Sequence, residues 1–477
     1  MSKRLDATLF AACARFGKAV ALEDTTTSLS YAQLAAAARE TAETLHREGL
    51  TADEPVLVAV ANAPEDIACF FGIWAAGGVV VPVSRAAPQA AKEATRAATA
   101  ARFMVTGRGA VSRLVGQPPP DRPLLKDAAF ILFTSGSTGA PKGVVLSHAA
   151  FVPKLAEINS VLGFAPETRA LLVLQIIFVF GIWYGLLALL NGGRVFMSAR
   201  FDPLATMAEI AERGVTDAAF VPTMLRRIVA AELAGVVPPL ARIHTGGEPF
   251  NTALGNRLRA ILPQVTVIDI YGLTETCTSN FFNVTAPSQA FTGAIGRPAR
   301  KDHFRIAGAE GHEVPPGEVG ELQIRTPFVM NGYLDQPELT RTSFAGDFFR
   351  TGDLARVRAD GAVELAGRVK DQINRAGAKV SPLELDHLIA QHPDVSAALT
   401  AGVPDAVTGE RIHVLVVPRA GVRIDEAALR AWVAERAEKF KRPDVYHFAS
   451  ELPVGRTGKV DREALRRSVA AQAKKGN

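Results

Sequence analysis

The uncharged segment Leu171–Leu190, LLVLQIIFVFGIWYGLLALL, is the feature that most restricts the fold of this chain. A helix of roughly 20 apolar residues is long enough to span a bilayer. However, arginines lie on both sides, at Arg169 and Arg194, and no second run of this kind exists, so the charge asymmetry of a membrane segment is missing. Gly181 and Gly185 divide the segment, which predicts a buried strand followed by a short buried helix. We therefore expect no membrane span.

The composition predicts a large globular protein. The chain has 477 residues, of which 48% are hydrophobic and 21% charged, so it can bury a large core and form roughly two to four domains. The net charge of +5 (53 minus 48) is scattered, without a dense basic block, and does not indicate a nucleic-acid partner.

The cysteines and the N-terminus both point to a reducing compartment. Cys13, Cys69 and Cys277 are too few and too scattered for a disulfide framework or a metal cluster. In MSKRLDATLFAACARFG, apolar residues recur at helical spacing, which favours an amphipathic helix over a secretory signal peptide. We expect a cytoplasmic protein.

The order of predicted elements indicates an α/β fold. LSYAQLAAAARETAETLHREGL and EDIACFFGIWAAGG read as helices, whereas EPVLVAV and VVVPV read as strands. This alternation predicts parallel-type sheets flanked by helices, and it resumes from Phe130 to about Val284. The intervening residues, Ser84 to about Lys126, read as helix and loop.

The second half of the chain changes character. Residues 303–327 and 348–368 contain short strands between Gly, Pro and Asp-Gly turns, which predicts a small antiparallel β unit. An α+β segment of about a hundred residues follows. We expect a large N-terminal region, residues 1–369, and a small C-terminal α+β domain, residues 370–477, with the boundary at Lys370.

FILFTSGSTGAPKG, residues 130–143, joins a hydrophobic strand to a loop of Thr, Ser, Gly and one Lys. Such a loop can direct backbone N–H groups and hydroxyls toward a polyphosphate, and Lys142 adds a positive charge. The loop is not a Walker loop, because Gly136 and Gly139 are too close together and PKG replaces GK[ST]. On composition alone, an ordinary Ser/Gly surface loop explains it equally well.

FTSGSTGAPKGVVLSH closely resembles the phosphate-loop signature of the adenylate-forming superfamily, which contains acyl-CoA synthetases, peptide-synthetase adenylation domains and luciferases. Further segments resemble motifs of this family in the family's order: GGEPF at Gly246, DIYGLTET at Asp269, FRTGD at Phe349, GRVKDQINRAGAKVSPLELD at Gly367 and LPVGRTGKVDREAL at Leu452. With weaker similarities before Val83, the resemblance covers nearly the whole chain.

The resemblance implies a set of functional residues. Thr274 would contact the α-phosphate of ATP, Glu275 would bind Mg²⁺, and Lys459 would bridge the substrate carboxylate and the α-phosphate. Asp353, with Arg368 beside it, would accept hydrogen bonds from the ribose hydroxyls. The full set of expected ATP-binding residues is Thr134, Ser135, Gly136, Ser137, Thr138, Gly139, Lys142, Gly247, Glu248, Pro249, Asp269, Tyr271, Gly272, Asp353 and Arg368.

Each of these residues has a simpler alternative when it is taken alone. Asp353 follows a glycine and is a good turn residue. Lys459 can lie in a solvated turn before a helix, and Glu275 can be a surface cap. The order of all six segments, rather than any one residue, favours the functional assignment.

The uncharged segment occupies the place where this family has one wall of its acyl pocket. The resemblance implies that Phe178, Phe180, Gly246 and Gly272 line this pocket. No acidic residue lies between Glu167 and Asp202, so a free α-amino acid would lack a counter-charge. With Trp183 and Tyr184 nearby, these features suggest an apolar aromatic or aliphatic acid. Arg194 is the one nearby base that a second carboxylate could use.

The resemblance implies a carboxylic acid–CoA ligase that uses ATP, Mg²⁺ and CoA. The small C-terminal domain of the family moves between the two steps, pivoting near Lys370, and would bring Gly377 to a narrow pantetheine tunnel. The main alternative is an enzyme that loads an acyl carrier protein; luciferase-like oxidation and a non-catalytic nucleotide-binding regulator are more distant. Thr326 replaces a frequent family glycine, and the interval between Val83 and Phe130 is short.

Overall fold

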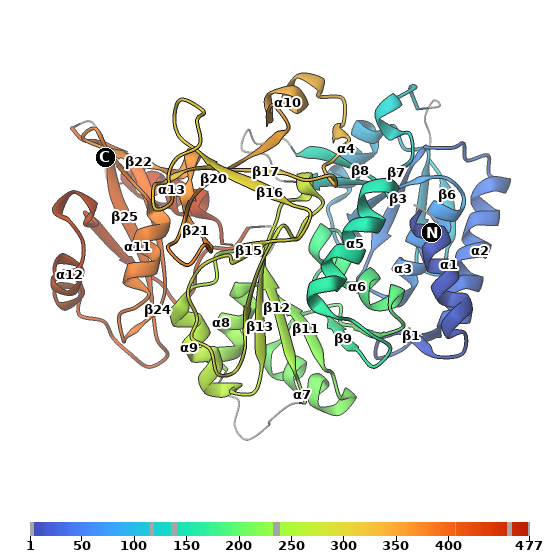
Figure 1. Ribbon diagram of the computed structural model, residues 1–477, viewed down its shortest axis with the longest axis horizontal. Helices are drawn as coiled ribbons and strands as arrows, with labels where there is room; N and C mark the ends of the chain where they lie inside the picture. Colours follow the sequence, from blue (N-terminus) through green and yellow to red (C-terminus); the bar gives the residue numbers. More distant parts are fainter. Residues whose placement is uncertain are drawn as a thin grey trace.

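The computed structural model describes residues 4–114, 119–134, 141–231, 239–405, 407–455 and 460–475, and the statements below refer to these residues. Figure 1 shows a large N-terminal part, coloured blue to yellow, beside a smaller C-terminal part in orange and red. The described residues form four sheets, two in the body of the N-terminal part, one at its edge and one in the C-terminal part.

A nine-stranded sheet has the order β15-β14-β13-β12-β11-β9-β10-β1-β2. Its centre, from β13 to β1, is parallel, and β2, β14 and β15 pair antiparallel at its ends. The strands are β1 (Val20–Glu23), β2 (Ser28–Ser30), β9 (Arg169–Leu172), β10 (Arg194–Met197), β11 (Asp217–Phe220), β12 (Arg242–Gly246), β13 (Thr266–Tyr271), β14 (Phe281–Thr285) and β15 (Arg297–Pro298).

A seven-stranded sheet has the order β18-β8-β7-β4-β3-β5-β6 and is mixed. Its strands are β3 (Pro55–Val60), β4 (Val79–Ser84), β5 (Phe103–Thr106), β6 (Ala110–Arg113), β7 (Ala128–Thr134), β8 (Lys142–Ser147) and β18 (Gly332–Tyr333). Strands β3 and β4 are buried along almost their whole length, as expected for parallel strands that are covered on both faces.

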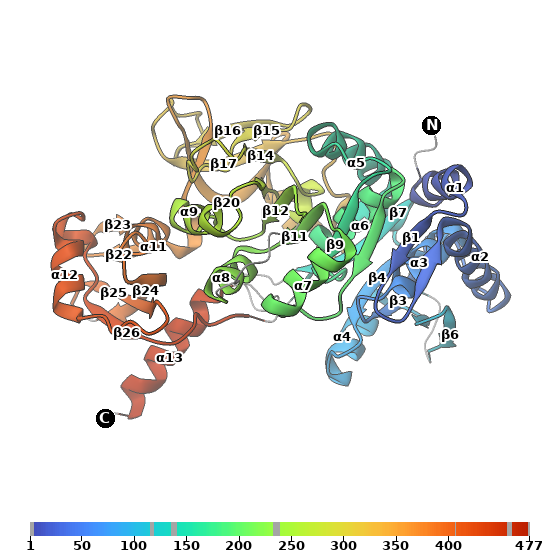
Figure 2. The ribbon, with the colours of Figure 1, turned by 90° about the horizontal axis from the view of Figure 1, so that it is seen from below.

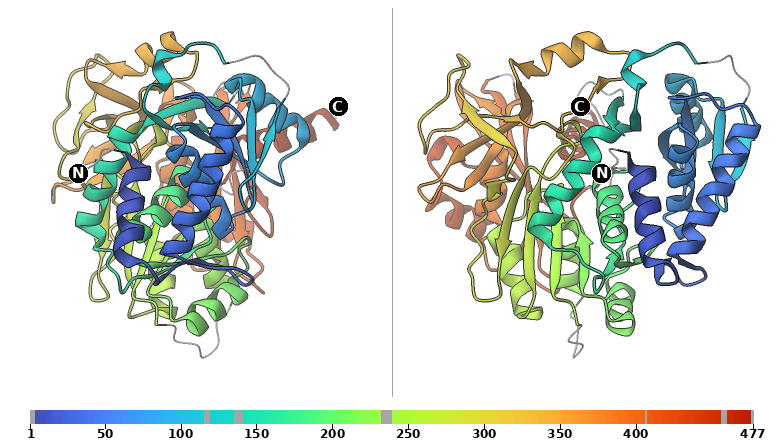
Figure 3. Two further views of the ribbon diagram at one scale, coloured as in Figure 1. Left: turned by 90° about the vertical axis from the view of Figure 1, so that its right-hand side faces the viewer. Right: turned by 45° about the vertical axis from the view of Figure 1, so that its right-hand side comes forward.

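A layer of helices separates the two large sheets. α3 and α5 contact the seven-stranded sheet, α2 and α6 contact the nine-stranded sheet, and α1 contacts all four of these helices. Figure 3 (right) shows the dark blue helix α1 and the teal helix α5 in this middle layer. The bounds are α1 (Leu5–Phe16), α2 (Tyr31–Arg47), α3 (Pro64–Ala75), α5 (His148–Leu162) and α6 (Val179–Leu190).

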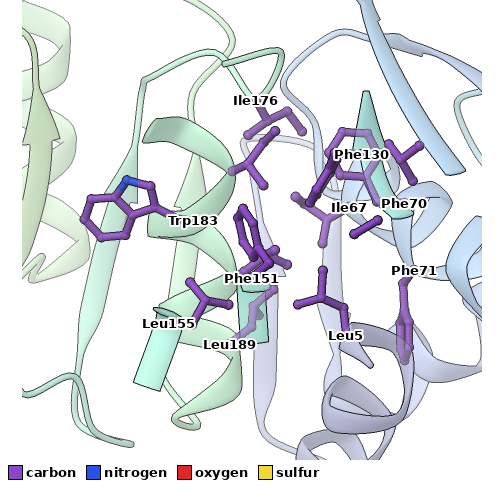
Figure 4. Close-up of a cluster of buried hydrophobic side chains, with 14 of the residues drawn as sticks. Leu5, Ile67, Phe70, Phe71, Phe130, Phe151, Leu155, Ile176, Trp183 and Leu189 are labelled. Atoms are coloured by element: carbon purple, nitrogen blue, oxygen red, sulfur yellow. The ribbon is translucent and has the colours of Figure 1, made fainter. Parts of the chain in front are cut away.

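The middle layer contains the main hydrophobic core. Figure 4 shows Leu5, Phe71, Phe130, Phe151 and Leu189 converging from the N-terminus, α3, β7, α5 and α6. All five side chains are at most 1% exposed, so removing any one of them would leave a cavity.

Helices also cover the outer faces of the sheets. α7 (Pro203–Arg213), α8 (Pro222–Ala230) and α9 (Thr252–Ile261) pack on the other face of the nine-stranded sheet in a separate apolar cluster. Leu125 of the 3-10 helix η1 (Pro123–Leu125) packs on the seven-stranded sheet, and α4 (Gln89–Thr99) leads from β4 into β5.

The third sheet is the predicted antiparallel β unit. Its strands are β16 (His303–Ala307), β17 (Gly320–Arg325), β19 (Phe344–Ala345), β20 (Phe348–Val357) and β21 (Val363–Arg368), and α10 (Pro337–Thr342) lies beside it. Strand β20 is central because it pairs with β17, β19 and β21.

The C-terminal part begins after the 3-10 helix η3 (Val369–Asp371), and Figure 2 shows it beside the body of the molecule. Its sheet contains β22 (Ile373–Arg375), β23 (Ala378–Val380), β24 (Val395–Asp405), β25 (Gly409–Pro418) and β26 (Val445–Phe448). Its helices are α11 (Pro382–Ile389), α12 (Glu426–Ala434) and α13 (Arg462–Lys475), with the 3-10 helix η4 (Lys439–Lys441).

The predicted fold class is confirmed, with one error in an element assignment. We expected helix and loop between Ser84 and Lys126, but the structure has strands β5 and β6 there. Each strand has only four residues, and β6 pairs with β5 alone, so neither carries a long alternating pattern.

The uncharged segment is buried inside the protein. Strand β9 ends at Leu172 and α6 starts at Val179, so the strand is shorter and the helix longer than predicted. From Gly181 to Leu189 every residue of α6 is buried, which explains why the helix is apolar on all sides. None of the helices in the described part of the chain combines the length and apolar character that a membrane crossing requires.

Candidate active site

Asp353 lies on the central strand β20 of the third sheet and is held between two other candidate residues. The Tyr271 hydroxyl donates to Oδ2 of Asp353 at 2.6 Å, and Nε of Arg368 donates to Oδ1 at 2.8 Å. Asp353 and Arg368 are register partners on β20 and β21, while Tyr271 ends β13 of the nine-stranded sheet. Burial and the Asp353 carboxylate raise the pKa of Tyr271 well above its ordinary value. The remaining lone pairs of this fixed carboxylate can accept bonds from ligand hydroxyls.

Asp269 lies two residues before Tyr271 on the same strand. It is 7% exposed, and burial raises the pKa of its carboxyl group to about 8. Its register partner on β12 is Thr245, whose buried hydroxyl has no hydrogen-bond partner within the described ranges. Buried polar groups normally have partners, so the hydroxyl of Thr245 keeps a hydrogen-bonding capacity that no described residue uses.

Glu275 lies in the 3-10 helix η2 (Thr274–Thr276), directly after the strand end. Its carboxylate accepts a 2.9 Å bond from the hydroxyl of Tyr333, and its carbonyl accepts from the N–H of Met330 at 2.8 Å. The ammonium of Lys142 lies 5.4 Å from the centroid of the Tyr333 ring. The predicted metal ligand and the predicted phosphate-binding lysine therefore meet at one tyrosine.

The phosphate loop is described only at its two ends. Thr134 ends β7 and Lys142 begins β8, and the two are antiparallel register partners. Ser135, Gly136, Ser137, Thr138 and Gly139 lie outside the described residues. The strand pair thus fixes both anchors of the loop, with Lys142 on the side of Tyr333 and Glu275.

The residues present fit a magnesium ion that takes most of its ligands from water and substrate phosphates. No group of three or more His, Cys, Asp or Glu side chains in the described residues forms a complete metal site. Mg²⁺ usually takes one or two carboxylates from the protein, with water and substrate phosphates completing its shell. Glu275 is half-buried and accepts a hydrogen bond from Tyr333, whose ring lies near the Lys142 ammonium, and a single carboxylate in such surroundings suits that arrangement.

Two glycines of the site are required by close contacts. A Cβ on Gly246 would lie 2.3 Å from the carbonyl oxygen of Ile270, and one on Gly272 would lie 2.2 Å from the backbone nitrogen of Ser279. Both neighbours are backbone atoms that cannot rotate away. Gly246 and Gly272 therefore let β12, β13 and the chain after Glu275 come together.

Glu248 is bound to other protein groups. Following β12 with Gly247 and Pro249, it accepts bonds from the N–H and hydroxyl of Thr223 and, at 3.2 Å, from Arg226. It also accepts a 2.9 Å bond from the N–H of Val460 in the C-terminal part. These contacts leave its predicted role in ATP binding untested and show that it links the two parts of the chain.

The other predictions for the C-terminal part stay predictions. Lys370 is exposed in η3, between the third and fourth sheets. Gly377 forms the tip of the hairpin between β22 and β23 with a φ of 86°, and nothing lies within 4 Å of a Cβ placed there. The positive φ alone explains why a glycine occurs at this position, so the glycine is not evidence for a pantetheine tunnel. Lys459 lies outside the described residues.

The candidate acyl-pocket aromatics fall into two groups. Phe178 and Phe180, at the start of α6, are half-buried, whereas Trp183 and Tyr184 are fully buried. Phe180 stacks on Trp183 at a centroid distance of 5.2 Å, so the fully buried Trp183 ring supports the half-buried Phe180 ring. Arg194 forms an ion pair with Glu23 of β1. The base that we considered for a second substrate carboxylate therefore already has an acidic partner.

Several residues of the site were not predicted from the sequence. Tyr333, Thr223 and Arg226 contact Glu275 or Glu248, but none belongs to a recognised segment. Tyr333 and Glu275 are 58 positions apart, so no local pattern could have paired them.

Comparisons with known proteins agree with this geometry. Residues 9–121 and 110–334 match the AMP-binding enzyme family, and residues 384–459 match the AMP-binding enzyme C-terminal domain. The chain is 34% identical to a sulfoacetate–CoA ligase of Cupriavidus necator over 350 residues, 73% of this chain and 67% of the relative. It is 30% identical to a feruloyl-CoA synthase of an Amycolatopsis species over 467 residues, 92% and 94% of the two chains.

A solved structure extends the similarity to the whole fold. ATP-bound MatB from Rhodopseudomonas palustris superposes with a TM-score of 0.85 at 25% identity, covering 97% of this chain and 98% of that one. The chain belongs to the AMP-binding enzyme family, as the sequence motifs predicted. The prediction of an AMP-forming acid–thiol ligase is confirmed at the level of the enzyme class.

Proposed function

We propose that this protein is a carboxylic acid–CoA ligase that activates an apolar aromatic or aliphatic acid with ATP. The proposal is carried by the contacts that the segment from Asp269 to Glu275 makes with other candidate residues. Tyr271 of this segment contacts Asp353, and Glu275 contacts Tyr333 beside Lys142. Tyr271 and Glu275 are four residues apart, so their Cα atoms lie at most about 14 Å from each other and both contacts belong to one short stretch of chain.

In the first step, a carboxylate oxygen of the acid attacks the α-phosphorus of ATP, and the bond to the β-phosphate breaks to release pyrophosphate. Lys142 and Thr274 bind the phosphates, and Asp353 holds the ribose through its fixed carboxylate. A Mg²⁺ ion held by Glu275 would neutralise phosphate charge. Lys459 bridges the acid and the α-phosphate.

In the second step, the sulfur of CoA attacks the acyl carbon and AMP leaves. The arrangement in this structure suits the first step better, because Val460 binds Glu248 of the N-terminal part, whereas the Gly377 hairpin bonds within the C-terminal part, from the N–H of Ala376 to the carbonyl of Thr408. We propose that rotation about Lys370 exchanges these two segments at the site.

The choice of acid follows from the charges and apolar side chains near α6 in the described part of the chain. Arg194 is paired with Glu23, and the half-buried Phe178 and Phe180 present apolar surface. An ammonium or a second acidic group would be buried there without a partner.

An acid panel tests the proposal. Benzoate, phenylacetate, ferulate, hexanoate, sulfoacetate and phenylalanine are each incubated with ATP and Mg²⁺, and pyrophosphate and AMP are measured with and without CoA. We expect pyrophosphate from apolar monocarboxylates and rapid AMP release only when CoA is added. Release with an acyl carrier protein but not with CoA would identify a carrier-loading enzyme instead.

The variant Lys459→Ala separates an enzyme from a nucleotide-binding regulator. We expect it to bind ATP normally and to form adenylate at least about 100-fold more slowly, as for removal of a charge that acts in the transition state. Lys439→Ala, a change of an exposed lysine in η4, serves as the control. Unchanged rates in Lys459→Ala would contradict the assigned role.

A further inference from the structure

A buried cluster of charges lies behind the candidate phosphate site. Lys154 and Glu157 of α5 and Asp302 are 1%, 7% and 5% exposed. The Lys154 ammonium contacts Oδ2 of Asp302 at 2.8 Å and Oε2 of Glu157 at 3.2 Å. Removing such charges from water is costly, and well-packed apolar side chains are often at least as stable. Stability alone therefore does not account for the cluster.

Hydrogen bonds connect this cluster to the active-site turn. Asp302 Oδ2 accepts from Nδ2 of Asn280 at 2.8 Å, and Oδ1 of Asn280 accepts from the hydroxyl of Thr276 at 2.5 Å. Thr276 directly follows Glu275 in η2. A continuous chain of side-chain contacts thus runs from α5 to the residue beside the predicted metal ligand.

The backbone between Thr276 and Asn280 is strained. Cys277, Thr278 and Ser279 have φ values of 56°, 66° and 51°, and three successive non-glycine residues rarely adopt this left-handed conformation. Such a turn persists only where its surroundings hold it. Asn280 holds the end of this turn with its backbone as well as its side chain. Its N–H donates to the carbonyl of Tyr271, and its carbonyl accepts from the N–H of Ala299.

The turn packs directly on the charged cluster. Burial raises the pKa of the Cys277 thiol to about 12, and the charges of Lys154 and Asp302 both act on this thiol. The backbone nitrogen of Ser279 also occupies the space where Gly272 lacks a side chain. The position of Thr274 and Glu275 therefore depends on how firmly Asn280 is held.

We infer that Lys154 is a positioning residue for adenylate formation: by fixing Asp302 and Asn280, it holds the strained turn that places Thr274 and Glu275 against the phosphates of ATP. This inference rests on the proposed function. Lys154 does not reach the substrate itself, since its ammonium is buried among Glu157, Asp302 and the ring of Phe328. It acts through the turn.

Two variants test the inference. Thr276→Val keeps the shape of the side chain and removes its hydroxyl, which donates to Oδ1 of Asn280 and also lies 3.2 Å from the carbonyl oxygen of Leu273. The triple variant Lys154→Met, Asp302→Asn, Glu157→Gln removes the ammonium together with the charges of both carboxylates that contact it, so neither is left as a buried charge without its counter-charge. Lys301→Met is the matched control, because the Lys301 ammonium lies over the same Phe328 ring, 5.8 Å from its centroid, on an exposed residue.

Both half-reactions are measured with the best acid of the panel. Pyrophosphate–ATP exchange reports adenylate formation, and mixing a synthetic acyl adenylate with CoA, without ATP or Mg²⁺, reports the transfer step. We expect both test variants to lose at least about tenfold in the kcat of exchange, while transfer and Tm stay near the wild-type values. The control variant should match the wild type in all three measurements.

Equal losses in both half-reactions would reduce Lys154 to a structural role and overturn the inference, as would wild-type exchange rates in both test variants. If the wild-type protein catalysed pyrophosphate–ATP exchange equally well without any acid, the proposed function would be wrong, and the inference would fail with it.

Discussion

The hydroxyl group of Tyr271 donates a 2.6 Å hydrogen bond to Oδ2 of Asp353, a residue 82 positions further along the chain. This bond joins the end of β13 in the nine-stranded sheet to β20 in the third sheet. The nucleotide site that we propose therefore lies where two sheets meet, and its geometry depends on both.

Replacing Asp353 with alanine should weaken ATP binding. The variant loses a fixed acceptor for the ribose hydroxyls, and each hydrogen bond to a charged group contributes about 1.5–3 kcal/mol. We expect the KM for ATP to rise at least about tenfold, with the KM for the acid unchanged, in a pyrophosphate-release assay. Asp347→Ala, at an exposed aspartate near β20, is the control. A normal KM for ATP would remove Asp353 from the site.

Asp269 should make the stability of the protein depend on pH. Burial raises its pKa from 3.8 in the unfolded chain to about 8 in the fold. Between these values the folded state holds a proton that the unfolded state has lost, so the contribution of Asp269 to stability is greatest below about pH 4 and falls as the pH rises to about 8. The slope contributed by one group is at most about 1.4 kcal/mol per pH unit.

The variant Asp269→Asn measures this effect because its side chain does not titrate. Denaturant unfolding at pH 5, 6, 7 and 8 should show the variant gaining stability relative to the wild type with each step. Parallel curves for the two proteins would mean that the carboxyl group is not protonated in the fold.

Gly272→Ala should disturb both stability and adenylate formation. The new Cβ would lie 2.2 Å from the backbone nitrogen of Ser279, so the strained turn must move. Overpacking of this kind costs about 3 kcal/mol. Gly185→Ala on α6 is the control, because its Cβ meets only the flexible end of Leu172 at 3.1 Å. A Gly272→Ala protein as stable and active as this control would disprove the close contact.

Glu248→Ala should affect the two steps differently. The change removes the acceptor for the Val460 N–H and for Thr223, so the C-terminal part loses a contact that it makes in this arrangement. We expect single-turnover adenylate formation to slow about tenfold, the effect of about 1.4 kcal/mol, while CoA transfer is unaffected. Glu248→Gln keeps an acceptor oxygen and should retain most of the rate; equal losses in both variants would argue against a linking role.

The sequence predicted those parts of the fold that repeat a local pattern. The buried β3 and β4 and the amphipathic α2 carry clear periodicity, and the turn-rich residues 303–368 became the antiparallel third sheet. The short strands β5 and β6 could not be predicted, because four residues are too few to establish a period.

The candidate site could be predicted only where a residue lies in a recognisable segment. Asp353, Tyr271 and Glu275 were found in this way. Tyr333 and Lys154 were missed because their roles arise from contacts across long sequence distances, such as the 148 positions between Lys154 and Asp302. A lysine on a helix normally lies in solvent, so its burial has no sequence signal.

The helices between the two large sheets have a consequence for folding. Strand β1, near the N-terminus, pairs with β10, and α1 contacts helices of both sheets. The nascent chain therefore cannot pair β1 with its parallel neighbour until Met197, the last residue of β10, has been synthesised. Partially synthesised chains would expose the apolar residues of α1 that pack on α5 and α6, and we expect these chains to require chaperone protection until both helices are available.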